Sequence, residues 1–123
     1  MAGQDYRFID AHLSRKGGIE VDEDVTLKPH QQVIYATSDG DDGAYTITLP
    51  HVSDAEGKFY SVIKDNEGQD NVTVTGETFI GTYQNVLDAV LTEEGEPDAP
   101  QSESLLLYSD GLVWHELHHE DGW

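Results

Sequence analysis

Six histidines are the residues of this chain best suited to metal chemistry, and three of them stand close together near the C-terminus. These three and the neighbouring carboxylates are His115, Glu116, His118, His119, Glu120 and Asp121. Imidazole and carboxylate suit zinc or nickel, and a homotrimer could gather three copies of one histidine on its axis. The spacing matches no established motif such as H-E-x-x-H. The sequence therefore favours an exposed polar tail, and we expect no metal and no other cofactor.

Two acidic stretches resemble calcium-binding loops, DGDDG at 39–43 and DNEGQD at 65–70. Neither has the complete 12-residue ligand register that ends in a bidentate glutamate. Both are typical of solvated turns.

The residue types needed for nucleophilic catalysis are present, namely the hydroxyls of Ser61 and Ser109 and the six histidines. No nucleophile elbow, P-loop or dinucleotide fingerprint accompanies them, and paired carboxylates are uninformative among 25 acids. The sequence predicts that the protein is not an enzyme.

Large aromatic side chains are the other candidates for a site. They could form a carbohydrate or partner platform, but more often such residues belong to a core. This group comprises Tyr35, Tyr45, Phe59, Tyr60, Tyr108 and Trp114. Trp123, at the end of the sequence, is better placed for an interface.

Charge is the most unusual property of the chain. Asp and Glu number 25 against 6 Lys and Arg, a formal net charge of −19, and no Lys or Arg follows Lys64. Such a surface repels phosphate backbones, so nucleic-acid binding is not expected. Self-repulsion of this size is tolerable near 1 M salt, where the Debye length is about 3 Å. The composition favours a protein of a salt-adapted organism over an acidic mesophilic protein or a disordered acidic tail.

The remaining bounds are simple. A length of 123 residues suits one domain, and the absence of cysteine excludes disulfides and thiolate metal sites. No stretch approaches the roughly 20 apolar residues of a membrane span, and the N-terminus lacks the pattern of a secretory signal. We expect no membrane partner.

The stretch at 105–117 predicts the hairpin around which the fold is organised. Two apolar runs flank Ser109-Asp110-Gly111, and an Asp-Gly pair between such runs is a strong hairpin signal. Both faces of this ribbon are largely apolar, so each needs cover, from a small β core or from another subunit.

Apolar alternation predicts further strands that start near residues 25, 33, 45, 59 and 72, at intervals of 8 to 14 residues. This rhythm predicts an all-β protein, a compact antiparallel β-sandwich or barrel. Residues 78–80 are expected as a short strand, and 83–91 as either strand or helical turn.

The domain organisation follows from composition. Residues 1–18 read as an extended N-terminal arm, either a frayed terminus or a segment that docks onto a neighbouring acidic subunit. Residues 19–123 read as one β-domain with an acidic loop near 92–104 and a short polar C-terminal tail at 118–123.

Four motifs in order resemble a module of tailed-phage virion proteins: YTITLP at 45–50, GKFYSVIK at 57–64, VTV at 72–74 and LLYSDG at 106–111 followed by Trp114. The resemblance covers about residues 20–117. It implies a β-rich homotrimer that occurs in capsid decoration proteins and in fibre or spike parts, with no catalytic residues. With the acidic composition, it implies a tailed virus of haloarchaea or of another salt-adapted host.

The sequence thus predicts a trimeric decoration protein on the capsid surface, made in the host cytoplasm, whose partners are the major capsid protein and itself. The alternative is a tail-fibre or spike module for receptor attachment. The expected capsid contacts are Tyr6, Arg7, Phe8, Arg15 and Lys16. The expected subunit contacts are Tyr108, Trp114 and Trp123.

Overall fold

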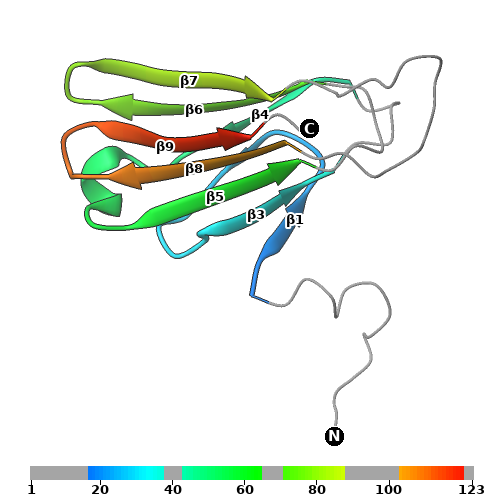
Figure 1. The fold of residues 1–123 in the computed structure, drawn as a ribbon, viewed down its shortest axis with the longest axis horizontal. Coiled ribbons are helices and arrows are strands. Elements are labelled where there is room, and N and C mark those ends of the chain that lie inside the picture. The colour runs from blue at the N-terminus through cyan, green and yellow to red at the C-terminus, as the bar shows by residue number, and fades with distance from the viewer. Residues whose placement is uncertain (1–16, 38–42, 65–70, 88–102, 121–123) are drawn as a thin grey trace, which may run out of the picture.

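The computed structural model describes residues 17–37, 43–64, 71–87 and 103–120, which form nine strands and one short 3-10 helix, η2 (Val52–Ala55). The prediction of an all-β protein is confirmed. Figure 1 shows long strands running side by side, with the turns after β6 and β8 gathered at one end. No closed barrel forms among the described strands, which make two separate sheets.

The five-stranded sheet has the order β1-β3-β5-β8-β9 and the four-stranded sheet the order β2-β4-β6-β7. The strands of the five-stranded sheet are β1 (Ile19–Val21), β3 (Val33–Ala36), β5 (Phe59–Lys64), β8 (Glu103–Ser109) and β9 (Trp114–Glu120). The strands of the four-stranded sheet are β2 (Val25–Thr26), β4 (Tyr45–Thr48), β6 (Val72–Thr78) and β7 (Gly81–Leu87).

The pairing corrects the prediction of an antiparallel fold. Four of the seven described strand pairs are parallel, and only β5–β8, β6–β7 and β8–β9 are antiparallel. From β1 to β6 the chain passes from one sheet to the other after every strand. In this part of the chain, neighbouring strands of one sheet are second neighbours in the sequence and run in the same direction, which makes their pairs parallel. Both sheets are mixed, because the later pairs β5–β8, β8–β9 and β6–β7 are antiparallel.

The central hairpin is confirmed. β8 and β9 pair antiparallel with Ser109 opposite Trp114, and Gly111 in the turn has a φ of 93°, which favours glycine. Along β8 the odd-numbered residues are buried and the even-numbered ones half-buried, as the alternation predicts. A register shift between Leu106 and Leu107 lets β9 carry one extra residue.

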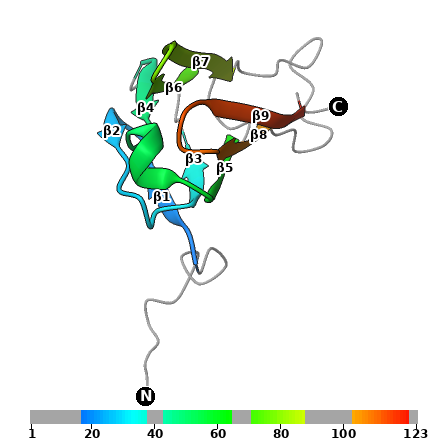
Figure 2. The same cartoon turned by 90° about the vertical axis from the view of Figure 1, so that its left-hand side faces the viewer.

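One apolar core lies between the two sheets, which face each other as layers in Figure 2. Tyr45, Ile47, Val72 and Val74 of the four-stranded sheet are buried, and the threonines between them point outward and are half-buried. The five-stranded sheet contributes the buried side chains Ile34, Ala36, Tyr60, Val62, Leu105, Leu107 and Trp114. The alternation predicted at 45–49 and 72–74 therefore identified the inward residues of β4 and β6.

Two segments differ from the prediction. Thr78 ends β6 and pairs with Gly81 of β7, so Phe79 and Ile80 form the two-residue turn between these strands; the Thr78 hydroxyl stabilises this turn by donating to the Gly81 carbonyl and accepting from the Ile80 N–H. The ambiguous stretch after it is a strand as far as Leu87. Residues 118–120 continue β9, so His118 and His119 lie on a strand and not in a tail. Of the acidic loop expected near 92–104, residues 103 and 104 belong to β8, and 92–102 lie outside the described residues, as do 88–91 and 121–123.

Side chains join the two sheets where β7 and β9 approach each other. The hydroxyl of Tyr83 and the amide nitrogen of Asn85 both donate to Oε1 of Glu116, at 2.9 and 2.7 Å. Burial and this carboxylate raise the pKa of Tyr83 above its ordinary value of 10.0, so its hydroxyl stays protonated and keeps donating. This contact fixes the edge of β9 against the other layer.

Candidate interaction surfaces

The three histidines of β9 do not converge on a common point. His115 and His118 pair with Tyr108 and Leu106, on the outer face of the sheet, whereas His119 pairs with the buried Leu105. Each imidazole Nε2 approaches its own carboxylate: 2.8 Å for His115 and Asp110, 3.6 Å for His118 and Glu120, 3.0 Å for His119 and Glu103. In the part of the chain that the structure describes, no group of three or more such residues could hold a metal ion.

Asp110 holds the turn between β8 and β9 together. Its Oδ1 accepts hydrogen bonds from the backbone N–H groups of Leu112 and Val113, both at 2.8 Å, and its Oδ2 faces His115. The hydrogen bond with His115, followed by those with the backbone of Val113 and Leu112, lowers the pKa of Asp110 from 3.8 to about 2. The carboxylate therefore acts as a structural acceptor.

We expect the carboxyl carbon of Asp110 to titrate near pH 2 by NMR, and at a higher pH in His115→Ala, which removes the largest cause of the shift; the pKa of the variant should stay below 3.8 because the backbone hydrogen bonds from Leu112 and Val113 remain. Because the folded pKa is depressed, the stability that Asp110 contributes is fully present above about pH 4 and is lost as the pH falls toward 2. A wild-type midpoint near 3.8 would contradict the turn geometry.

The two serines considered for catalysis have different surroundings. Ser109 is fully buried, donates to the carbonyl of Val52 at 2.6 Å and accepts from the N–H of Gly111 at 3.1 Å. Both bonds tie η2 and the β8–β9 turn together, so the Ser109 hydroxyl has a structural role. Ser61 is half-buried on the outer face of the five-stranded sheet, opposite Leu106.

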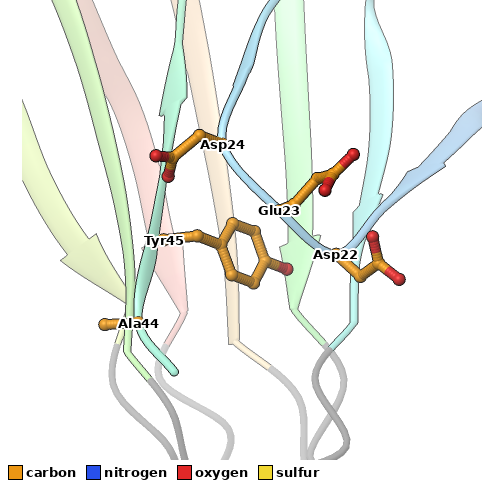
Figure 3. Close-up of a pocket in the computed structure, with 5 residues that line it drawn as sticks. All are labelled: Asp22, Glu23, Asp24, Ala44 and Tyr45. Carbon is orange, nitrogen blue, oxygen red and sulfur yellow. The ribbon is translucent and has the colours of Figure 1, made fainter. Parts of the chain in front are cut away.

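An acidic hollow of about 300 Å³ is lined by Asp22, Glu23, Asp24, Ala44 and Tyr45. Figure 3 shows that the three carboxylates point in different directions and do not meet at one position. Asp24 accepts from the backbone N–H of Thr46 at 2.8 Å, and the Tyr45 hydroxyl donates toward the carbonyls of Val21 and Thr37. These bonds fasten the β1–β2 connection to the start of β4. Of the two calcium-like loops, 65–70 and all but Gly43 of 39–43 lie outside the described residues.

Among the large apolar side chains of the described structure, the three most exposed lie on the hairpin turns. Ile80 is 85%, Leu112 61% and Phe79 60% exposed. The turns are held side by side by the hydrogen bond from the Phe79 N–H to the Leu112 carbonyl at 3.0 Å, and Phe79 makes a ring contact with His51. Sequence reasoning missed this apolar tip, although bulky apolar residues at turn positions, where small and polar residues dominate, were a usable signal.

A second apolar surface covers the outer face of the five-stranded sheet. The rings of Phe59 and Tyr108 lie 4.7 Å apart between centroids, and the ring of His115 lies 6.3 Å from that of Tyr108. Phe59 is 51% exposed, although it begins β5, the central strand of the five-stranded sheet. A surface of this kind is typical of binding to another macromolecule.

The predicted contact residues have different positions. Tyr108 lies on this outer face and is half-buried. Trp114 is 6% exposed in the core of the single chain, so less than a tenth of its surface remains for a partner subunit. Trp123 and the arm residues Tyr6, Arg7, Phe8, Arg15 and Lys16 lie outside the described residues.

Comparisons of the chain with protein-family models, with curated proteins and with solved structures each find no match. Within the described ranges, none of the helices has the length and apolar character needed to cross a membrane. The surfaces described above are therefore the features of the molecule that bear on its function.

Proposed function

We propose that the protein is a capsid decoration protein of a tailed virus, bound in many copies to the outside of the shell as a homotrimer. The observation that carries the proposal is the combination of a net charge of −19 with large apolar side chains left exposed on strands and turns. Exposing these side chains to water is unfavourable, and contact with another protein would offset that cost. Many modest contacts repeated by symmetry would stabilise a shell under internal pressure.

In this proposal the folded unit is a two-layer β-sandwich, and residues 1–18 form the arm that reaches the major capsid protein. The arm carries three of the six cations of the chain, Arg7, Arg15 and Lys16, together with Tyr6 and Phe8. An acidic shell subunit would attract these cations, and the two aromatic side chains would supply buried area at the contact.

The test is binding to purified shells that lack the protein. We expect sedimentation with the shells in molar salt, saturating at hundreds of copies or more per particle, and loss of binding on deletion of residues 2–16. Folding of the deletion variant is checked by its circular dichroism spectrum. No co-sedimentation of the full chain would overturn the proposal.

A tail-fibre or spike module is the second candidate, and the parallel pairing favours it. Strands that alternate between two sheets form rungs that stack along one axis, an arrangement suited to elongated proteins. Copy number separates the candidates, because a handful of copies per virion indicates a fibre.

The acidic composition further supports a salt-adapted host. We expect the melting temperature to rise steadily from low salt to molar NaCl, because screening weakens repulsion among 25 carboxylates. Sucrose at equal osmolality is the control, since it carries no ions. A melting temperature that rises no more in NaCl than in sucrose would count against this host.

A further inference from the structure

The outer face of the five-stranded sheet is uncharged at its centre. Strand register places Phe59, Tyr108 and His115 in one row across β5, β8 and β9, and Ser61, Leu106 and His118 in the next. β3 adds Val33 and Tyr35, and β5 adds Ile63, all half-buried. At the outward positions of these described strands, the carboxylates are Glu20 on β1 and Glu120 at the end of β9, both at the margin.

The outer face of the four-stranded sheet is different and provides a comparison. Where β4 and β6 pair, the outward positions are threonines: Thr46 pairs with Thr73, and Thr48 with Thr75. The next outward position on β6 is the exposed Glu77. Threonine suits a strand that stays in contact with water, because its hydroxyl remains solvated while its methyl group covers the sheet. The two layers therefore present one hydroxyl-rich and one apolar, aromatic face.

We propose that the outer face of the five-stranded sheet is the contact between copies of this chain. Two copies that each carry a net charge of −19 repel each other in most relative orientations, because acidic surfaces then face each other. Contact through this face brings apolar and aromatic rows together and leaves the marginal carboxylates at the rim, where water still reaches them. The inference specifies the subunit contact of the proposed homotrimer and rests on that function only for its oligomeric state.

The size of the face is compatible with such a contact. The five strands are three to seven residues long, and at about 4.8 Å between strands and roughly 3.3 Å per residue they cover about 400 Å² in plan. The accessible area is larger, because side chains stand out from the sheet, and a specific interface needs about 800 Å² per partner. The face is therefore smaller than a standard interface and fits the class of weak contacts below about 1,200 Å² in total, so we expect association in the micromolar range that depends on concentration.

The test uses a matched pair of variants and the purified full chain alone in molar salt. Leu106→Glu places a carboxylate at the centre of the proposed contact, and Thr73→Glu places one on the outer face of the other sheet. Both positions are half-buried on interior strands, and both variants change the net charge equally. Sedimentation velocity over a range of concentrations measures association, and circular dichroism checks folding.

We expect the wild type and Thr73→Glu to associate alike, and the dissociation constant of Leu106→Glu to rise by about tenfold or more, since a buried unpaired carboxylate costs at least about 1.4 kcal/mol. Phe59→Ser, which adds no charge at a half-exposed site, is expected to weaken association in the same direction. Should Leu106→Glu fail to fold, Phe59→Ser decides the question.

A wild type that stays monomeric at all concentrations overturns the inference, as does equal association of the variants. Weakening by Thr73→Glu alone would assign the contact to the other sheet and overturn it as well. If a monomeric wild type still binds shells and Leu106→Glu does not, the face belongs to the shell contact: the inference and the trimeric state fail, and the decoration function stands. If the wild type associates through this face but ignores shells, the function fails and the inference stands.

Discussion

Replacing Trp114 with alanine is expected to lower the free energy of unfolding by about 3–5 kcal/mol, the usual cost of removing a large aromatic side chain from a core. Trp114 is 6% exposed, and its ring meets that of Tyr60 edge-on, with centroids 5.4 Å apart. Its Nε1 has no hydrogen-bond partner among the described residues, so the indole stabilises the fold by packing. Denaturant unfolding followed by circular dichroism measures the loss.

Leu117→Ala is the control for this substitution. Leu117 lies on the same strand but is 50% exposed, so its truncation should cost less than about 1 kcal/mol. If Trp114→Ala does not fold, Trp114→Phe gives a smaller loss, because it removes an unsatisfied N–H together with part of the ring. Equal losses for Trp114→Ala and Leu117→Ala would contradict the placement of Trp114 in the core.

Gly76→Ala is expected to destabilise the protein by about 1–3 kcal/mol, the typical cost of overpacking a core. A Cβ at Gly76 would lie 2.8 Å from Nε1 of Trp114 and 2.9 Å from Cδ1 of Leu49, closer than real contacts allow. The sign of the effect is informative. A glycine-to-alanine change that meets no obstacle usually stabilises a protein by about 0.4–1 kcal/mol, because it restricts the unfolded chain.

Unfolding measurements on three variants separate a clash with the indole from a general effect of substitution on this strand. The variants are Gly76→Ala, the neighbouring Glu77→Ala and the double variant Gly76→Ala/Trp114→Phe. Glu77 is exposed, so its replacement should change stability by no more than about 0.5 kcal/mol. The double variant should lose less than the sum of its two single variants, because the alanine methyl and the indole nitrogen compete for the same space. A stabilising Gly76→Ala would show that the indole does not occupy this position.

Local patterns predicted much of the fold. The Asp-Gly pair and the alternation around it are contained in 13 residues, so the β8–β9 hairpin could be predicted from sequence, but not its inward face, because both faces are largely apolar. The alternation at 45–49 likewise identified Tyr45 and Ile47 as core residues. These features depend on the two-residue period of a strand, which the sequence displays directly.

Strand direction could not be predicted, because parallel and antiparallel strands have the same two-residue period. The parallel pairing of β3 with β5 depends on where the chain crosses between the sheets, over 28 residues from Val33 to its partner Ser61. Trp114 could not be assigned to core or interface either, because both faces of its hairpin are apolar. The apolar tip depends on a contact between Phe79 and Leu112, which are 33 positions apart in the sequence.

The alternation of the chain between the two sheets bears on the cooperativity of unfolding. Because β1 to β6 alternate between the sheets, no continuous half of the sequence contains a complete sheet. Neither sheet can unfold without displacing strands of the other, so we expect the molecule to unfold in a single cooperative step, without a partly folded intermediate. Most of its pairings join distant segments, and we expect it to fold slowly for its length, on the millisecond-to-second scale.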